Sequence, residues 1–371
     1  MHFQIKRDTL LKSLNIAHNI IERKNTLPIL SNVLLEAKNN RLTIVATDLD
    51  LVFHDEIQEL KIIQDGSTTT SATVLHDLLR KLTSNLDVTF NLKDENKLNI
   101  SAENSKFNLL CLPVNNFPNF SDNFNGEGIN LNKKTFLSLL NKTKISMSND
   151  ETRHYLNGIF VHTAESNGKL YLTAVATDSH RLSSSSLEIE KNIVFEPIIL
   201  PKKTIFQLIS LMEQSSAKIK ISNNKSKVKF VMDSGILISK VIDGRFPDYS
   251  KVVPKDNNKI LQIKLNEFKT SIERVTTVSA DKKEGLKMGI KKDSLQLSVN
   301  SPNSGEGVEN ISANFNSEDM SISFNSRYLI DITSQIENEK IIMNLKEPGS
   351  PVLIKDLSDK LSFHVVMPMK I

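Results

Sequence analysis

The stretch TAVATDSHRL, residues 173–182, has an earlier counterpart in TIVATDLD, residues 43–50. Both contain Val-Ala-Thr-Asp, so that Asp48 corresponds to Asp178 about 130 residues later. One shared tetrapeptide is weak support for a repeat. A repeat of the whole chain requires helices and strands to recur at the same step.

Two predicted helices recur at that step, and a third, more diverged copy follows. Their apolar residues have the spacing of a helix with one buried face. The first helices of the three repeats carry Leu10, Leu14, Ala17 and Ile21; Phe136 and Leu140; and Phe268, Ile272 and Val275. The second helices carry Leu75, Leu78, Leu79 and Leu82; Ile205, Leu208, Ile209 and Met212; and Leu329, Ile332 and Ile336.

The repeat ends also correspond. Phe117-Pro118 at the end of the first repeat corresponds to Phe246-Pro247 at the end of the second. In the third repeat, the predicted strand SLQLSVN, residues 294–300, corresponds to the Val-Ala-Thr-Asp strands but has Asn-Ser in place of Thr-Asp. The Asn-, Asp- and Gly-rich run Ser121–Gly128 is typical of a linker. With short alternating strands between the helices, this pattern predicts an α+β fold of three tandem similar domains, each with two helices packed on antiparallel sheets. The predicted domains are residues 1–125, 129–250 and 254–371.

Composition indicates a soluble globular protein. Of 371 residues, 39% are hydrophobic and 24% charged, and no apolar run approaches the ~20 residues of a membrane span. The N-terminus lacks the apolar segment of a secretory signal. Cys111 is the only cysteine, which excludes a disulfide framework and fits the reducing cytoplasm; we expect a small core residue there. The net charge of +4 permits a nucleic-acid partner.

Catalytic chemistry has little support. Asp48 and Asp178 occur at the same position of two repeats, which favours a turn role at the strand end over a pair of catalytic carboxylates. Only the second repeat continues with Ser179-His180-Arg181-Leu182, and this spacing is not that of a nucleophilic triad. Nucleotide-binding and zinc-protease motifs are missing, and the histidines never fall at metal-ligand spacing. We therefore predict no enzyme, metal or cofactor; an acid–base pair of Asp178 and His180 is the competing hypothesis.

The C-terminal tail departs from the repeat pattern. Val365, Met367 and Met369 alternate as in a strand. Such a strand fits burial in the third core. Methionine equally suits a surface that accepts several partners, because its side chain is unbranched and polarisable.

Together these motifs resemble a known family, the bacterial sliding clamps that form the beta subunit of DNA polymerase III. The resemblance covers the whole chain in order. It is carried by the three repeats and by TLPILSN (26–32), YLNG (155–158), ATDSHRL (176–182), DGRFPDY (243–249) and VVMPMKI (365–371).

The resemblance implies a processivity factor of DNA replication that performs no catalysis. Two subunits would join head to tail into a ring around double-stranded DNA, with helices lining the hole and sequence-independent phosphate contacts weak enough for sliding. The predicted helix regions supply the basic residues Lys12, Lys24, Arg80, Lys81, Lys133, Lys134, Lys142, Lys144, Lys202, Lys203, Lys269, Arg274 and Arg327. The positions implied to face DNA are Lys24, Arg80, Arg153, His154, Lys202 and Lys203, with the acidic Asp150 as a departure in the loop 149–154.

The resemblance also implies a pocket for partner peptides between the second and third domains. Its implied residues are Leu156, Thr177, Ser179, His180, Arg181, Leu182, Pro247, Lys251, Val252, Val365, Met367, Pro368, Met369 and Lys370. Ser179 stands where the family often has glycine, and Lys251 and Lys370 where arginine is common. The implied partners are the alpha and delta subunits of DNA polymerase III, other polymerases, repair factors and the clamp loader.

For the subunit interface, the resemblance implies Phe107 and Leu109 on one side and Thr277 and Val278 on the other. Thr277 replaces a usual apolar residue. A three-domain adaptor that binds partner peptides without forming a ring is the alternative function.

Overall fold

The computed structural model describes residues 1–22, 26–94, 96–120, 124, 128–190, 193–215, 218–279 and 285–369. The chain forms two compact units. Unit 1 contains Met1–Lys134, Ile193–Glu196 and Lys203–Val241, and unit 2 contains Thr135–Asn192, Pro197–Lys202 and Ile242–Ile371. The division falls inside the second repeat, so the predicted domain boundaries remain predictions.

A single continuous sheet runs through unit 1, and all of its strand pairs are antiparallel. The first repeat contributes nine strands and the second repeat four. In sheet order these are β10 (Ile129–Asn132), β15 (Lys218–Asn223), β16 (Lys227–Met232), β17 (Gly235–Lys240), β4 (Leu51–Ile57), β3 (Arg41–Thr47), β2 (Asn32–Lys38), β6 (Gly66–Ser71), β9 (Ser105–Leu112), β8 (Lys97–Ala102), β7 (Asp87–Asp94), β1 (His2–Lys6) and β5 (Leu60–Gln64).

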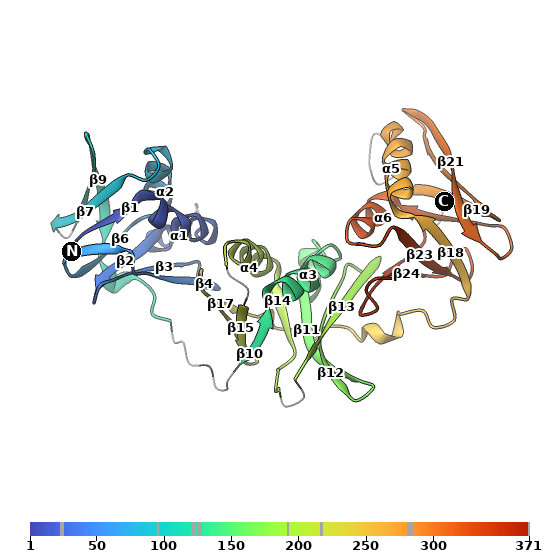
Figure 1. The fold of residues 1–371 in the computed structure, drawn as a ribbon, viewed down its shortest axis with the longest axis horizontal. Coiled ribbons are helices and arrows are strands. Elements are labelled where there is room, and N and C mark those ends of the chain that lie inside the picture. The colour runs from blue at the N-terminus through green and yellow to red at the C-terminus, as the bar shows by residue number, and fades with distance from the viewer. Residues whose placement is uncertain are drawn as a thin grey trace. The chain divides into compact units, whose positions relative to one another are not determined.

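Helices α1 (Arg7–Ile20) and α2 (Ala72–Lys81) pack against each other and against strands of unit 1 (Figure 1). The predicted apolar stripe of α1 is buried at Leu10 and Leu14, while Lys12 on the opposite face is exposed. Ser71 caps α2, because its Oγ accepts a hydrogen bond from Val74 N at 3.3 Å. Nearly all of α4 (Lys202–Gln214) also belongs to unit 1.

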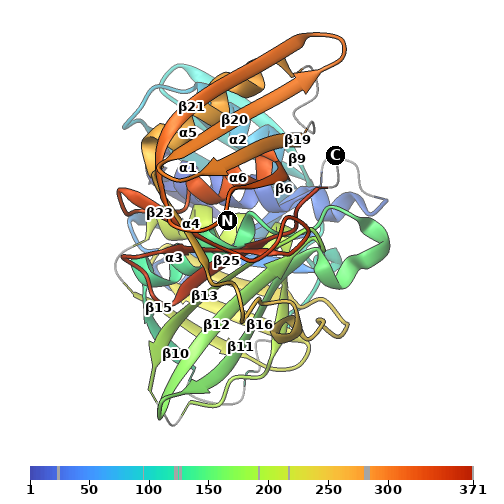
Figure 2. The ribbon, with the colours of Figure 1, turned by 90° about the vertical axis from the view of Figure 1, so that its right-hand side faces the viewer.

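Unit 2 also contains one continuous antiparallel sheet, in which β11, β12 and β13 are followed by β25 (Figure 2). In sheet order its strands are β14 (Ile198–Pro201), β11 (Gly158–Ser166), β12 (Lys169–Thr177), β13 (Arg181–Ile189), β25 (Ser362–Val366), β24 (Val352–Asp356), β23 (Lys340–Leu345), β18 (Lys259–Lys264), β21 (Gly305–Phe315), β20 (Ser294–Ser301), β19 (Gly285–Lys291) and β22 (Met320–Asn325).

Three further helices complete the predicted two per repeat: α3 (Lys133–Lys144), α5 (Leu265–Val275) and α6 (Ser326–Thr333). Asn132 precedes α3 as predicted, and its Oδ1 accepts a hydrogen bond from Lys134 N at 2.9 Å. In the third repeat, Phe268 of α5 and Leu329 of α6 are buried in one core together with apolar residues of the strands. The α+β prediction of helices on antiparallel sheets is confirmed.

Short 3-10 helices occupy several connections: η1 (Pro28–Ser31), η2 (Val114–Asn116), η3 (Glu151–Leu156), η4 (Tyr249–Lys251) and η5 (Thr276–Val278). None of the described helices is long and apolar enough to cross a membrane. The predicted linker 121–128 lies mostly outside the described residues. Cys111 is buried as expected, and this burial raises the pKa of its thiol.

The predicted C-terminal strand is too long. β25 ends at Val366, so Met367 and Met369 do not continue the strand alternation. The physical reason is Pro368, which has no N–H to donate to a ladder. Met369 N instead donates to Ser323 O at 2.7 Å, outside the β13–β25 pair.

Gly158, from the YLNG motif, permits a close backbone approach. It starts β11 and faces Pro201 in the pairing with β14. A Cβ at this position would lie 2.1 Å from the carbonyl oxygen of Leu200. Any side chain there would push two paired strands apart.

We predict that Gly158→Ala lowers the free energy of unfolding by about 2–3 kcal/mol, because the clash is with backbone that cannot rotate away. The matched control is Gly349→Ala, since an added Cβ there meets nothing within 4 Å. Urea unfolding of both variants measures the difference, and equal stabilities would contradict the proposed clash.

Candidate functional site

An apolar cluster in unit 2 joins the second repeat to the end of the third. Leu156 and Leu182, two predicted pocket residues, pack there with Val365 from β25. Sequence reasoning missed the other buried members of this cluster, Val175, Ile199, Phe246 and Leu353. Phe246 could have been found, because it lies inside the motif DGRFPDY. Its ring stacks on Phe160 with the two centroids 4.9 Å apart.

Strand pairing brings these segments together. β13 pairs with β25 so that Leu182 faces Val365 and Arg181 faces Val366. Because successive residues of a strand point to opposite faces, Val365 packs in the shared cluster and Val366 in the core of the third repeat. After the strand ends, Met367 N still donates to His180 O at 2.9 Å. The C-terminal tail therefore lies against the turn that contains His180.

That turn is held by Asp178. Its Oδ1 accepts hydrogen bonds from His180 N at 3.0 Å and from Arg181 N at 2.9 Å. Asp48 accepts the equivalent pair of bonds in the first repeat, which confirms the predicted turn role of both aspartates. Ser179 has a φ of +76°, which explains why glycine suits this position. Its Oγ accepts a 2.7 Å hydrogen bond from Arg153 Nη1.

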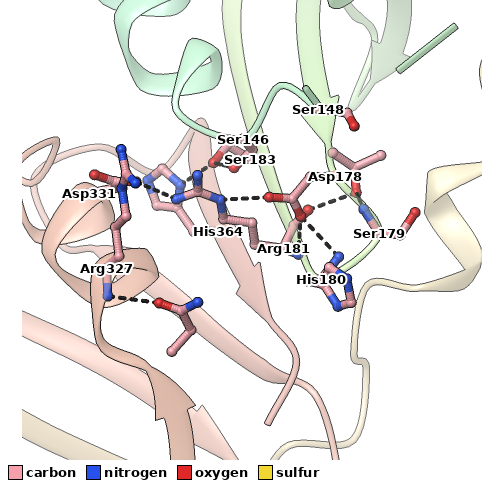
Figure 3. Close-up of polar contacts among 12 residues, drawn as sticks. Ser146, Ser148, Asp178, Ser179, His180, Arg181, Ser183, Arg327, Asp331 and His364 are labelled. Atoms are coloured by element: carbon pink, nitrogen blue, oxygen red, sulfur yellow. Dashed lines mark hydrogen bonds and ion pairs between the residues drawn. The ribbon is translucent and has the colours of Figure 1, made fainter. Parts of the chain in front are cut away.

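Arg181 links the turn to the third repeat (Figure 3). Its Nε lies 3.0 Å from Asp178 Oδ2 and its Nη1 lies 2.6 Å from Asp331 Oδ2. Its guanidinium also lies 4.3 Å from the centroid of the Tyr328 ring. Burial, with help from the nearby Asp178 carboxylate, raises the pKa of the Tyr328 hydroxyl. Arg181 thus connects the turn to the third repeat by pairing with the carboxylates of both Asp178 and Asp331.

A buried polar chain connects the second and third repeats (Figure 3). Ser146 Oγ lies 2.7 Å from Ser183 Oγ, which lies 2.7 Å from His364 Nδ1. Burial lowers the pKa of His364 to about 4, with the charges of Lys142 and Arg181 acting in the same direction. His364 is only 3% exposed, so this serine–histidine contact is closed to a substrate.

Lys142 departs from the expectation of a basic residue on an open helix face. It is buried, and its Nζ lies 2.7 Å from Asp359 Oδ2. Its long apolar stem lets it occupy the inner face of α3 while its charge is paired. Arg274 is also paired, with Glu309, but this pair lies at the surface of the third repeat.

The competing acid–base pair is not assembled. The Asp178 carboxylate accepts hydrogen bonds from the Arg181 side chain and from the backbone N–H groups of His180 and Arg181, and the His180 ring is not among its partners. Within the described ranges, no three His, Cys, Asp or Glu side chains are grouped to hold a metal ion. The His180 side chain is exposed.

The remaining predicted pocket residues surround the cluster at its surface. Thr177 Oγ1 donates to Arg181 O at 2.7 Å and holds the turn closed. Val252 is 42% exposed and Met369 39% exposed, so apolar surface is open there. Lys251 lies 3.5 Å from Asp248, and Pro247 is exposed. Lys370 lies outside the described residues.

The predicted DNA-facing residues of unit 2 lie in the loop 149–154 or, like Lys202, contact it. Arg153 Nε lies 2.9 Å from Asp150 Oδ2, and Lys202 Nζ donates to Asn149 Oδ1. Hydrogen bonds from Thr152, followed by Arg153, lower the pKa of Asp150. His154 Nε2 donates to Asp243 O at 3.1 Å. Asp150 therefore neutralises part of the loop's positive charge.

The predicted DNA-facing residues of unit 1 differ in availability. Arg80 is exposed near the end of α2, with only a weak 3.8 Å contact to Asp77. Lys203 donates to Ile20 O at 2.9 Å and pairs with Asp48, so much of its charge is compensated internally. Lys24 falls outside the residues that the structure describes.

Each unit has a strand whose outer edge is open along most of its length. Residues 105–110 of β9 pair with β8, and among the described residues no strand covers their other edge. Residues 305–312 of β21 likewise pair only with β20 among the described strands. Phe107 and Leu109 alternate along β9 and are half-buried, and Leu110 on the opposite face is 76% exposed.

The other predicted interface residues, Thr277 and Val278, lie in η5. Val278 packs partly against the core of the third repeat. Thr277 is exposed, and its Oγ1 donates to Glu273 O at 3.0 Å. The Thr277 hydroxyl is therefore satisfied within its own chain.

Family models match the chain in order. The models for the N-terminal, central and C-terminal domains of the DNA polymerase III beta subunit match residues 1–121, 130–248 and 250–370. Among curated proteins, a beta sliding clamp of Caulobacter vibrioides is 37% identical over 373 residues and covers 100% of both chains. One from Pseudomonas putida is 30% identical over 374 residues with the same coverage.

Solved structures agree. A beta sliding clamp of Caulobacter crescentus, 37% identical, superposes with a TM-score of 0.97 over 100% of this chain and 99% of its own. A sliding clamp of Bartonella birtlesii bound to griselimycin, 34% identical, gives a TM-score of 0.96 with 100% of both chains covered. The likeness extends over the full length of the chain.

We predict that His364 makes stability depend on pH. Its folded pKa of about 4 lies below the ordinary 6.5, so the unfolded chain binds more protons between these values. Stability is therefore full above about pH 6.5 and falls by about 3 kcal/mol as the pH drops to about 4. Urea unfolding at pH 7 and pH 4 measures this loss. His364→Asn should show a smaller loss, and an unchanged pH dependence would contradict the assignment.

Proposed function

Because the chain belongs to the family of DNA polymerase III beta subunits, we propose that it is a sliding clamp, a non-catalytic processivity factor of DNA replication. The observation that carries this proposal is the full-length match, in order, of all three repeats to beta sliding clamps. Its work is mechanical, since it would keep a polymerase on DNA and leave the chemistry to the bound enzyme. We place it in the cytoplasm.

A closed ring of two subunits would hold the DNA. The unpaired edge of β9 suits antiparallel pairing with the unpaired edge of β21 in a second copy, because each exposes a row of backbone donors and acceptors. Such a head-to-tail contact closes after two subunits in the proposed dimer. Phe107 and Leu109 would then pack beside Thr277 and Val278.

Double-stranded DNA would pass through the ring without sequence readout. The attraction comes from exposed cations that face phosphates, and weak contacts of this kind permit sliding. Arg80, Lys202 and Arg153 are our candidates, together with Lys203, His154 and Lys24. Other basic side chains that remain exposed on the helices are Lys12, Lys81, Lys134 and Arg327.

Partners would dock at the apolar cluster of unit 2 and its rim. An extended peptide with a leucine or phenylalanine side chain fits a site of apolar surface with few polar groups. Val252 and Met369 offer open apolar contact, and His180 offers a hydrogen-bonding ring. The partners we propose are the alpha and delta subunits of DNA polymerase III, other polymerases, repair factors and the clamp loader.

Topological retention is the first prediction of this function. Once an ATP-driven loader has placed the clamp on DNA, we expect it to remain on closed circular plasmid through gel filtration in high salt. Linearising the plasmid should release it, because a ring slides off an open end. Equal loss from both forms would contradict encirclement and favour the alternative of an adaptor without a ring.

The β9 edge gives a second prediction. Leu109→Asp places a charge in the proposed interface, and we expect the dimer to dissociate about a hundredfold more readily, because a charge buried without a partner costs several kcal/mol. Sedimentation over a dilution series measures the dissociation constant. Asn108→Asp adds the same charge on the opposite face of β9 and is the control. If both variants dimerise like the parent protein, the subunit contact lies elsewhere.

A further inference from the structure

Unit 1 contains an apolar cavity that the proposed function does not use. Its volume is about 310 Å³. Val45, Val52 and Ile238 line it, together with Phe117 and Phe120. A cavity of about 150 Å³ holds a benzene ring, and sites for small ligands begin at about 300 Å³, so this cavity has room for one or two apolar side chains.

Strand register shows that this cavity occupies the position of the partner pocket, one repeat earlier. In unit 1, β4 pairs with β17 so that Val52 faces Ile238. In unit 2, β13 pairs with β25 so that Leu182 faces Val365. Both junctions join one repeat to a strand of the next repeat. The floor of each site is therefore an apolar pair at the same position, Val52 with Ile238 in unit 1 and Leu182 with Val365 in unit 2.

The backbone after each junction is equivalent as well. Lys240 N donates to Asp50 O at 2.8 Å in unit 1, as Met367 N donates to His180 O at 2.9 Å in unit 2. Asp50 and His180 occupy the same position of the turn that follows Val-Ala-Thr-Asp. The correspondence thus extends from the floor to the rim, which Asp50 and Lys240 form in unit 1 and His180 and Met367 form in unit 2.

The walls correspond too. Phe117 and Phe120 at the end of the first repeat take the places of Phe246 and Tyr249 at the end of the second. Phe246 is buried in the cluster of unit 2, and Tyr249 packs against it. Val45, on β3, stands where Val175 stands on β12.

The rims differ in chemistry. An exposed ion pair of Lys240 and Asp50, 2.9 Å apart, stands where unit 2 has Met367 and His180. The partly exposed imidazole of His54 also lines the cavity. An occupant can therefore place an apolar side chain against Val52 and Ile238 and offer a hydrogen-bonding group to His54.

We propose that this cavity is a second docking site for a short extended peptide segment of a partner protein. A leucine or phenylalanine side chain enters between Val52 and Phe120, and the peptide backbone hydrogen-bonds to His54. The class of occupant rests on the proposed function of the equivalent site in unit 2. The cavity itself does not depend on it.

A methyl NMR titration tests both sites in one sample. The probe is N-acetyl-leucyl-phenylalanine amide, added to the full-length protein with labelled isoleucine methyl groups. Ile236 and Ile238 report on the cavity of unit 1, and Ile199 and Ile242 report on the cluster of unit 2. We expect saturable shifts at both pairs.

Two matched variants assign the shifts. Phe120→Ala should weaken binding at Ile236 and Ile238 about tenfold, the loss expected for one aromatic contact, and leave Ile199 unchanged. Tyr249→Ala, at the equivalent position, should do the reverse. His54→Phe keeps an aromatic ring in the cavity lining, removes the hydrogen-bonding nitrogens and should also weaken only the unit 1 site. Thermal unfolding of each variant identifies any that is misfolded.

The outcomes separate the two proposals. Shifts at Ile199 and Ile242 alone would overturn the second site and leave the partner pocket standing. Shifts at Ile236 and Ile238 alone would support the second site and count against the partner pocket. Shifts at neither pair would overturn both sites. Movement of Ile236 on dilution of the protein without probe would assign the cavity to a second copy of the chain and also overturn the proposal.

Discussion

Backbone pairing between strands of successive repeats is the constraint on which this structure depends. β4 pairs with β17 in unit 1, and β13 pairs with β25 in unit 2. Each pairing satisfies polar backbone groups that would otherwise be left at a sheet edge. It also fixes register, and a slip of one residue would turn every apolar side chain to the wrong face. The sheets therefore continue from one repeat into the next.

Recognition surfaces follow from that register. Because Leu182 faces Val365, an apolar cluster forms where neither repeat alone has enough surface. Arg181, one residue earlier, reaches Asp331 and ties the turn to the third repeat. The same construction in unit 1 places a cavity beside the Val52–Ile238 pair, and Lys240 and Asp50 stand at its edge where unit 2 has Met367 and His180. Pairing between strands of successive repeats thus produces two sites whose rims differ in chemistry.

Periodicity within the sequence predicted the elements well. Helical spacing at Leu10 and Leu14, the capping residue Asn132 and the turn role of Asp178 all required only local information. Long-range partners could not be inferred in this way. Nothing near Lys142 in the sequence indicates that Asp359 will pair with it. The early end of β25, in contrast, is a local feature. Pro368 has no backbone N–H to donate to a neighbouring strand, and this outweighs the alternation of Val365, Met367 and Met369.

Counting basic residues is consequently a poor guide to the field that DNA would meet. Lys142 is paired inside unit 2, Lys203 is paired to Asp48, and Asp150 lies beside Arg153. Since phosphate attraction scales with the number of unpaired cations, this internal pairing reduces the strength of any contact with DNA. A clamp that is held on DNA by closure does not require strong phosphate binding, and tight contacts would slow its movement. The internal pairing of these basic side chains is thus compatible with a protein that must hold DNA and still slide along it.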